Sequence, residues 1–285
     1  MVSGMISSKQ TNITLNNNKT QIIGLCGSAQ SGKSTSASYL AGLTWHTHRM
    51  VEKFKVDESG KLVIYDLNSH SFPEGKRFDC FHWDNDPEIN QALERCLVHP
   101  ANLVHRIAFG DILKEILQLM FGLDPNKLWG SDKDKAAETI YTVGQFRELL
   151  GVAKFPFKNK KDSEKLSYRE MLQVFGTEVG RRISPTLWVD RSVERIYDII
   201  NQWRPALIVV DDVRIETELD AIKKMGGSTI ALLRQVKTSA GVSHASEQTH
   251  KLFEKCDYAI KNQDMSINDQ CIELFTIMQH ISQKV

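Results

Sequence analysis

One short segment of the chain has both the residue types and the spacing that hold a row of phosphates. Gly27-Ser-Ala-Gln-Ser-Gly-Lys-Ser34 fits the pattern G-x-x-x-x-G-K-[ST] without a mismatch. Its glycines let the backbone curl, so that successive N–H groups point inward as an anion-binding nest. A buried strand is predicted before it at 21–26, and a helix after it at 34–43 adds partial positive charge. The segment therefore predicts a site for the phosphates of ATP, in preference to a Gly/Ser turn that happens to contain a lysine.

Two side chains of this segment are expected to act on the phosphates directly. Lys33 would reach the β- and γ-phosphates and follow the γ-phosphate into the transition state, which makes it a catalytic candidate. The hydroxyl of Ser34 would ligate Mg²⁺. The other residues expected to bind ATP surround these two: Gly27, Ala29, Gln30, Ser31, Gly32 and Thr35.

An acidic pair supplies the second half of such a site. The apolar run 206–210 is the strongest strand pattern in the chain, and Asp211 and Asp212 follow it directly. A carboxylate that ends a strand beside the phosphate segment holds Mg²⁺ directly or through water. Periodicity does not decide which of the two faces the metal, and a pair of acids that simply ends a strand at the surface is the alternative. Asp211, Asp212 and Ser34 are therefore the predicted metal ligands.

Strand and helix patterns alternate along the chain, which favours right-handed crossovers and a parallel sheet. A hairpin is predicted at 51–65 and irregular structure at 69–86. We expect an α/β protein: a three-layer P-loop kinase fold with a central parallel sheet of about five strands and an inserted acceptor-binding region. The other predicted strands are 103–109, 206–210, 229–233 and 258–260, and the other helices are 111–121, 142–150, 167–181, 186–203, 216–225 and 267–281.

The predicted organisation is one kinase domain at 21–285 behind a flexible polar tail at 1–20. An insertion at about 45–205 is expected to bind the acceptor. The segment at about 237–249 lacks apolar periodicity, and we expect it to be a lid that closes over ATP.

Charge balance and cysteine spacing exclude several classes of protein. Lys and Arg total 36 against 35 Asp and Glu, so the net charge of +1 gives no basic excess for wrapping nucleic acid. The five cysteines form no C-x-x-C pair, so neither a zinc site nor a disulfide framework is indicated. The first twenty residues are too polar for a signal peptide, and no apolar stretch approaches a membrane span. We expect a protein of the reducing cytoplasm with no nucleic-acid or membrane partner.

Two other classes of nucleotide-binding protein fit the sequence less well. Asn159-Lys-Lys-Asp162 matches the guanine-reading N-K-x-D pattern, but it lies in a basic polar run instead of following a buried strand. The acidic strand also lacks the D-x-x-G pattern of GTPases. A motor or nucleic-acid ATPase would need a Glu after the strand-end Asp and a basic groove, and neither is clear.

Arginines near the predicted sheet edges favour a kinase of a small phosphorylated acceptor. Such an enzyme must hold two anionic substrates together and neutralise the charge on the transferring group. Arginine suits this task because its planar fork binds phosphate with two donors at once. The candidates are Arg106, Arg181, Arg182, Arg214 and Arg234.

Several segments follow one another in a fixed order: Arg106–Lys114, Arg169–Arg181, Leu187–Asp190, Asp212–Arg214 and His244–Glu247. Together they resemble the bacteriophage deoxynucleoside monophosphate kinases. The likeness covers about 100–285 together with the phosphate segment, and its Phe-Gly-Thr and His-x-Ser-Glu elements are the more specific parts. It implies ATP-dependent phosphorylation of deoxynucleoside monophosphates to diphosphates, which feeds dNTP synthesis, in the infected host cell if the protein is viral. A dephospho-coenzyme A or phosphomevalonate kinase is the nearest alternative, and a non-kinase P-loop NTPase a more distant one.

The resemblance also implies roles for particular residues. Arg214 and one of Arg181 and Arg182 would clamp the acceptor phosphate, and Arg234 would lie near the transferred phosphoryl group. Phe175 and Trp188 are equally compatible with being plain core aromatics. The segment 45–90 has no counterpart in the resemblance, and a homodimer is compatible with the sequence. The residues expected to bind the acceptor are Arg106, Asp111, Lys114, Phe175, Gly176, Thr177 and Trp188.

Overall fold

The computed structural model describes residues 6–7, 19–28, 30–78, 87–94, 96, 99–151, 155–234 and 252–283. The chain forms two compact units, the first made of Met1–Ala108 and Ile196–Val285 and the second of Phe109–Arg195. The second unit lies within the predicted insertion at 45–205, whose exact limits stay a prediction. The predicted lid at about 237–249 lies outside the described residues, as does most of the predicted tail at 1–20, in which Ile6–Ser7 form the short strand β1.

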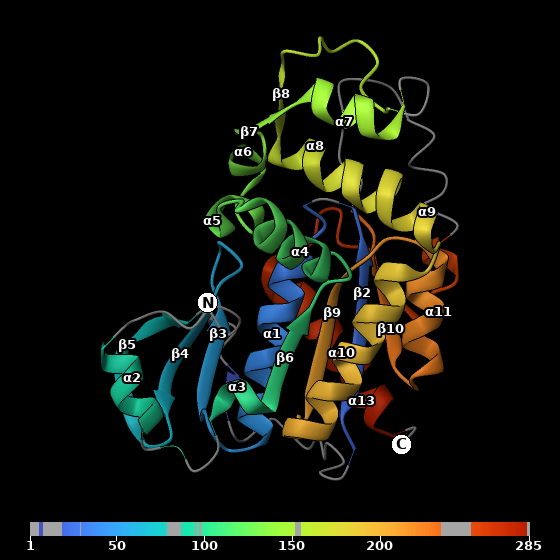
Figure 1. Ribbon diagram of the computed structural model, residues 1–285. Coiled ribbons are helices and arrows are strands. Elements are labelled where there is room, and N and C mark those ends of the chain that lie inside the picture. The colour runs from blue at the N-terminus through green and yellow to red at the C-terminus, as the bar shows by residue number, and fades with distance from the viewer. Residues whose placement is uncertain are drawn as a thin grey trace. The chain divides into compact units, whose positions relative to one another are not determined.

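A five-stranded parallel sheet forms the centre of the first unit, as predicted (Figure 1). Its spatial order is β11-β10-β2-β9-β6, and each neighbouring pair is parallel. The central strand β2 is buried from residue 22 to residue 26, as expected for a parallel strand with both faces covered. The strands are β2 (Gln21–Gly27), β6 (Val104–Ile107), β9 (Leu207–Val213), β10 (Ser228–Leu232) and β11 (Tyr258–Ile260).

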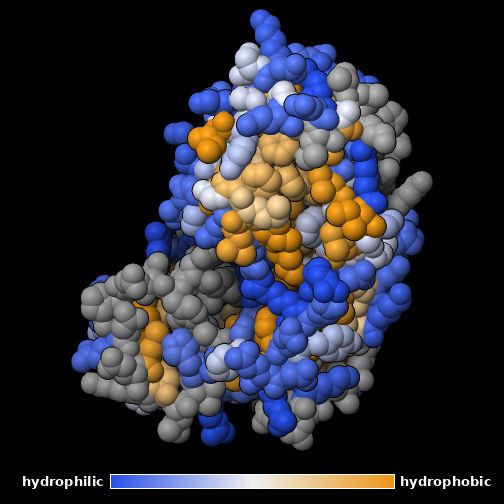
Figure 2. Space-filling model, in the orientation of Figure 1, coloured by the Kyte–Doolittle hydropathy of each residue, from blue (hydrophilic) through white to orange (hydrophobic). Residues whose placement is uncertain are grey.

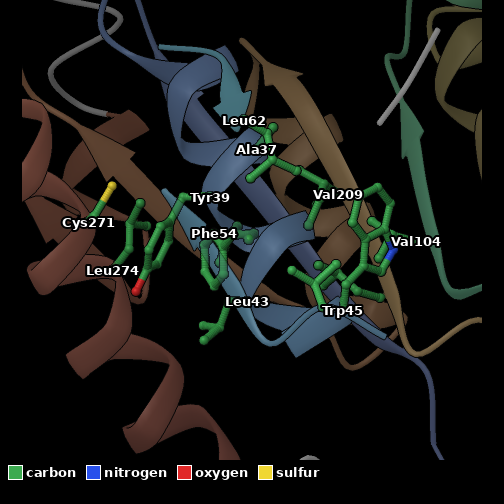
Figure 3. Packing of buried hydrophobic residues seen from close by; sticks show 14 of the residues in the cluster. Ala37, Tyr39, Leu43, Trp45, Phe54, Leu62, Val104, Val209, Cys271 and Leu274 are labelled. Atoms are coloured by element: carbon green, nitrogen blue, oxygen red, sulfur yellow. The ribbon is translucent and has the colours of Figure 1, made fainter. Parts of the chain in front are cut away.

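Helices cover the two faces of this sheet. On one face lie α1 (Lys33–Thr47) and α13 (Ile267–Gln283), whose shared core is shown in Figure 3, with Tyr39 of α1 beside Leu274 of α13. On the other face lies α11 (Glu216–Lys224), whose Ile222 contacts Gly24 of β2. The short helices α2 (Pro87–Glu94) and α3 (Pro100–Leu103) precede β6. Three layers result, which is the fold class that the sequence predicts.

A second sheet of four antiparallel strands packs against α1. Its order is β1-β3-β4-β5, with β3 at Lys53–Val56, β4 at Leu62–Leu67 and β5 at His70–Phe78. The hairpin predicted at 51–65 is therefore confirmed. Phe54 and Leu62 from this hairpin lie against Gly42 of α1 and are fully buried there.

The expectation of irregular structure at 69–86 is wrong for residues 70–78, which form β5. Pro73 and Gly75 interrupt the alternation of apolar residues by which a strand is found in a sequence. A proline is tolerated here because β5 is an edge strand. The register shifts between Ile64 and Asp66, and Gly75 has a φ of +76°, which favours glycine, so a bulge takes up the extra residues.

The second unit is mainly helical and contains one two-stranded antiparallel sheet, β7-β8. Its core is formed by apolar residues that include Leu117, Leu166 and Met171. Figure 2 shows apolar surface on this unit. Leu119 and Met120 of α4 are among its exposed large apolar residues. Its elements are α4 (Asp111–Phe121), α5 (Pro125–Leu128), α6 (Asp132–Lys135), β7 (Glu138–Thr142), α7 (Val143–Leu150), β8 (Lys165–Ser167), α8 (Tyr168–Gln173), a π-helix (Val174–Gly180), α9 (Arg181–Ile183) and the start of α10 (Leu187–Trp203).

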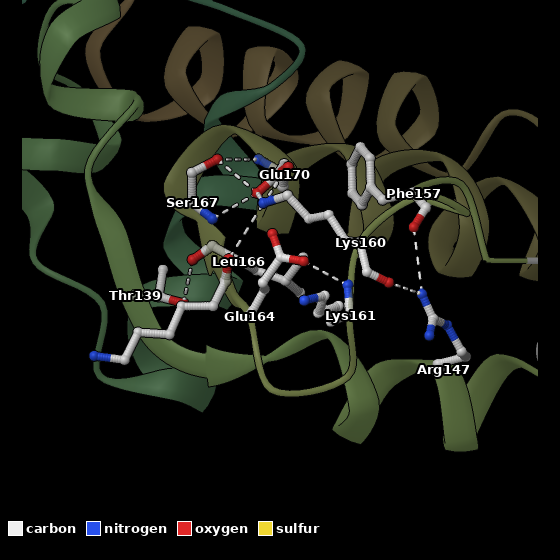
Figure 4. A network of polar contacts seen from close by, with 10 residues as sticks. Thr139, Arg147, Phe157, Lys160, Lys161, Glu164, Leu166, Ser167 and Glu170 are labelled. Atoms are coloured by element: carbon white, nitrogen blue, oxygen red, sulfur yellow. Dashed lines mark hydrogen bonds and ion pairs between the residues drawn. The ribbon is translucent and has the colours of Figure 1, made fainter.

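The basic run that contains Asn159–Asp162, the match to the guanine-reading motif, is held in this unit by polar contacts (Figure 4). Lys160 forms an ion pair with Glu170 at 2.7 Å, and Arg147 forms one with Asp162. Arg147 also donates to the carbonyl of Lys160 over 2.6 Å. These contacts give Asn159–Asp162 a structural role in the turn before β8.

Among the described residues, no helix has the length and apolar character that crossing a bilayer requires.

Asp257 joins the edge strand β11 to β10, and its substitution tests how acid weakens the first unit. Its carboxylate accepts hydrogen bonds from the backbone N–H of Thr229 at 2.8 Å and from the Thr229 hydroxyl at 2.7 Å, and it pairs with Lys223 at 3.2 Å. Burial acts to raise the pKa of Asp257, but the bonds from Thr229 and Lys223 outweigh it and hold the pKa below its ordinary value.

A lowered pKa in the folded state gives stability that is present above the unfolded pKa, about 3.9, and is lost as the pH falls through the folded pKa. We therefore expect Asp257→Asn to lower the urea midpoint at neutral pH and to lose that deficit progressively below about pH 4. Urea titrations of both proteins across this range are the measurement. A deficit that stays constant with pH would contradict this account of Asp257.

Candidate phosphate-binding site

The segment Gly27–Ser34 connects β2 to α1, so it lies at the carboxyl end of the central strand. Gln30 and Gly32 have positive φ values of +60° and +90°. Residues with positive φ that alternate with residues of negative φ form the concave backbone nests that bind anions. The N-cap residue of α1 is Gly32, which provides no side-chain cap, so the first N–H groups of the helix could bind a phosphate. Ala29 lies outside the described residues.

Lys33 folds back over this loop. Its Nζ donates to the carbonyl of Gly27 over 2.7 Å and to that of Ser28 over 2.6 Å. Burial is the main cause that lowers the pKa of Lys33; Asp212 acts against it and Arg214 reinforces it. The ammonium group therefore lies at the loop itself, within electrostatic reach of the carboxylates on β9.

The neighbouring loop residues differ in their surroundings. Ser34 is exposed in the first turn of α1, and Ser31 is buried. Thr35 lies against Gly60 in the turn between β3 and β4, where an added Cβ would come within 2.4 Å of the Thr35 hydroxyl. The antiparallel sheet, whose segment has no counterpart in the family resemblance, thus contacts the start of α1.

The two predicted metal ligands lie at a bulge in β9. The apolar pattern predicted the end of this strand at Val210, but the strand continues to Val213. Gly24 pairs with Val210 and Cys26 pairs with Val213, so β9 has one residue more than β2 between the two pairs. Bulges of this kind redirect side chains and are frequent beside active sites. Here the bulge accommodates Asp211 and Asp212 inside a strand of the central sheet.

Each of these carboxylates is paired with an arginine that the sequence had marked as a substrate ligand. Asp211 is only 4% exposed, and its Oδ2 accepts a hydrogen bond from Nε of Arg106 on the neighbouring strand β6 at 2.6 Å. Oδ1 of Asp212 accepts one from Nε of Arg214 at 2.7 Å. Burial acts to lower the pKa of Arg214, but the hydrogen bond that it donates to Asp212 outweighs burial and raises the pKa. Four of the predicted residues therefore form two ion pairs at the carboxyl edge of the sheet.

Two buried amides that sequence reasoning did not select also contact the loop. Asn262, just after β11, donates to the carbonyl of Ser31, and Gln270, in α13, donates to the carbonyl of Gly32. Gln270 could have been noticed in the sequence as a polar residue at a buried position of the amphipathic helix α13. The sequence does not show, however, that it faces the phosphate loop. Arg234 is exposed and stands two residues beyond the end of β10.

In the second unit, the predicted acceptor residues Phe175, Gly176 and Thr177 all lie in the π-helix Val174–Gly180. The sequence predicted one α-helix over 167–181, and the structure differs because the backbone widens here into seven residues of π-helix. The indole Nε1 of Trp188 donates to the carbonyl of Gly176 at 2.8 Å, and its ring lies against Gly180. Short π-helical segments are frequent at functional sites. Trp188 thus holds this segment through its N–H.

The other predicted acceptor residues of this unit are already engaged in contacts. Asp111 and Lys114 form an ion pair at 2.9 Å in the first turn of α4. Phe175 packs in an aromatic group, with its ring centroid 4.8 Å from that of Phe121 and 5.6 Å from that of Phe146. Arg182 pairs with Glu178. Arg181 is exposed beside it in α9. Which of these residues touch a substrate stays a prediction.

Comparison with known families places the chain. The family described as deoxynucleotide monophosphate kinase matches residues 111–271. The chain belongs to this family. It is accordingly a phosphotransferase that acts on deoxynucleotide monophosphates, as the resemblance of its motifs implied. A search of curated proteins finds no match. The matched range includes the π-helix, the ion pair of Asp212 with Arg214, Asp211 and both buried amides. The Gly27–Ser34 loop and Arg106, the partner of Asp211, precede it.

Glu218 offers a test of how the site's edge is built. Its buried carboxylate accepts the backbone N–H of Arg214 at 2.7 Å and that of Ile215 at 3.3 Å, and so it caps α11 and fixes the backbone of Arg214. We expect Glu218→Ala to cost about 1–2 kcal/mol, as loss of a helix cap does. Glu216→Ala, which removes an exposed carboxylate that pairs with Lys255, should cost less than about 0.5 kcal/mol. Urea unfolding of both variants decides the matter, and equal losses would mean that Glu218 is no cap.

Proposed function

We propose that this deoxynucleotide monophosphate kinase uses ATP with Mg²⁺ as its phosphoryl donor and produces deoxynucleoside diphosphates for dNTP synthesis. The observation that carries the proposal is the Gly27–Ser34 loop: an uncapped helix N-terminus, a concave backbone and Lys33 at one end of the central strand. These features suit a polyphosphate more than any other ligand class. Membership of the family indicates the class of acceptor, and the loop is the reason for proposing ATP as the donor.

In this proposal the N–H groups of the loop bind the β-phosphate, and Lys33 exchanges its carbonyl partners for phosphate oxygens. Ser34 and one or both carboxylates of Asp211 and Asp212 would hold the Mg²⁺. The donor set fits, because Mg²⁺ takes hard oxygen ligands and is usually bound by one or two carboxylates together with water and substrate phosphates. Within the described residues, no group of three or more His, Cys, Asp or Glu forms a cage that would favour another metal. The ion would neutralise charge on the transferring phosphoryl group.

The chain's own residues would then act by position and charge. Arg106 and Arg214 lie on the two carboxylates at the sheet edge, where a second anionic substrate would compete for them. A guanidinium binds phosphate with two parallel hydrogen bonds and stabilises charge that spreads over the equatorial oxygens during transfer. No covalent intermediate on the protein is needed, because the phosphoryl group passes in line from donor to acceptor.

Substitution of Lys33 tests the donor site. Lys33→Ala should lower kcat by about 10²-fold or more, as removal of one preorganised electrostatic donor does, while the protein stays folded. ADP release with each deoxynucleoside monophosphate, coupled to a spectrophotometric readout, measures this. Lys224→Ala, which removes an exposed lysine at the end of α11, is the control and should be fully active. Near-normal turnover of a folded Lys33→Ala enzyme would rule out this loop as the donor site.

Arg214→Lys keeps the charge but removes the planar fork. A point charge does not reproduce bidentate binding, so we expect a higher acceptor KM and a lower kcat. Arg191→Lys is the matched control, because Arg191 is exposed and pairs with Glu194 on its own helix. If both constants of Arg214→Lys equal those of the control, Arg214 does not bind substrate.

A further inference from the structure

Asn262 and Gln270 form a buried amide pair beneath the phosphate loop. Asn262 Nδ2 donates to the carbonyl of Ser31 at 2.7 Å and to Oε1 of Gln270 at 3.1 Å. Gln270 Nε2 donates to the carbonyl of Gly32 at 3.2 Å and to the hydroxyl of Ser36 at 2.8 Å. The two residues are only 3% and 5% exposed, respectively. Their orientation is fixed, because each amide nitrogen faces groups that accept hydrogen bonds.

These bonds determine where two N–H groups of the loop point. The peptides are trans and planar, so in each the carbonyl and the following N–H point in opposite directions. Fixing the carbonyl of Ser31 therefore aims the N–H of Gly32 away from Asn262. Fixing the carbonyl of Gly32 aims the N–H of Lys33 away from Gln270. These two N–H groups stand at the N-terminus of α1, where an anion would bind.

The pair also connects the loop with the exit of β10. The backbone N–H of Asn262 donates to the carbonyl of Leu233 at 3.2 Å, and the N–H of Leu233 donates to the carbonyl of Ile260 at 2.8 Å. Leu233 directly precedes Arg234, the residue expected near the transferred phosphoryl group. Asn262 thus bonds both to the loop, at the carbonyl of Ser31, and to the backbone next to Arg234, at the carbonyl of Leu233.

We propose that Asn262 and Gln270 are positioning residues of the kinase reaction, which preset the N–H groups of Gly32 and Lys33 for the phosphates of the donor. The inference rests on the proposed function, because it assigns the donor phosphates to this loop. Both residues act through the loop backbone. Their loss should therefore weaken donor binding and turnover and leave acceptor binding intact.

Gln270→Met and Asn262→Asp are the test variants. The first keeps the volume of the side chain and removes its hydrogen bonds, and the second replaces the donor facing Ser31 by an acceptor. We expect each to lower kcat/KM for ATP by about tenfold or more, because small misplacement of a binding group has effects up to about 10²-fold. The KM for the deoxynucleoside monophosphate should stay unchanged. Leu274→Ala, one turn further along α13 and fully buried, is the control for general loss of packing.

A second readout reports the N–H group itself. In protein labelled with [¹⁵N]glycine, inorganic tripolyphosphate with Mg²⁺ should move the Gly32 amide resonance of the wild type strongly, and that of Asn262→Asp much less. Full ATP efficiency in folded Gln270→Met and Asn262→Asp, or an equal rise of both KM values, would overturn the positioning role. A wild-type Gly32 resonance that ignores tripolyphosphate would instead overturn the donor site, so the two failures are distinguishable.

Discussion

The parallel pairing of β2 between β9 and β10 is the constraint on which the candidate site depends. Ile23 of β2 lies in register with Val209 of β9 and with Ser228 of β10, so all three strands end at the same edge of the sheet. This edge therefore collects the loop after Gly27, the carboxylates of β9 and the chain that leaves β10. Residues far apart in sequence become neighbours because parallel strands bring their carboxyl ends together. The burial of β2 on both faces holds this register.

Charge at that edge is balanced within the protein. Asp211 would be costly to bury alone, and the guanidinium of Arg106 from the adjacent strand compensates it. Arg214 stands in the same relation to Asp212. In the proposed reaction these four residues would take part in phosphoryl transfer, and the arginines would exchange their carboxylate partners for an anionic substrate. The buried amides of Asn262 and Gln270 contribute in a different way, because they orient N–H groups of the loop backbone and not charged side chains.

Motif and periodicity predicted the five parallel strands and most helices of the first unit, because each of these elements buries a continuous or regularly spaced apolar set. They missed β5, where Pro73 and Gly75 break the pattern of an edge strand. They also ended β9 too early, because a bulge and not an apolar run carries the strand through Asp211 and Asp212. The amide pair of Asn262 and Gln270 could not be predicted, since its meaning lies in contacts with residues more than two hundred positions away. Periodicity also predicted a plain α-helix at 174–180, and the contacts of Trp188 with Gly176 and Gly180 in this π-helix are seen only in the structure.

The most direct test of the account is the fate of the γ-phosphate. The purified protein is incubated with Mg²⁺, ATP labelled in its γ-phosphate and one deoxynucleoside monophosphate at a time, and the products are separated. For at least one base, the account predicts labelled deoxynucleoside diphosphate in an amount equal to the ADP formed. Labelled inorganic phosphate without labelled diphosphate for any base, or no reaction of ATP at all, would contradict it.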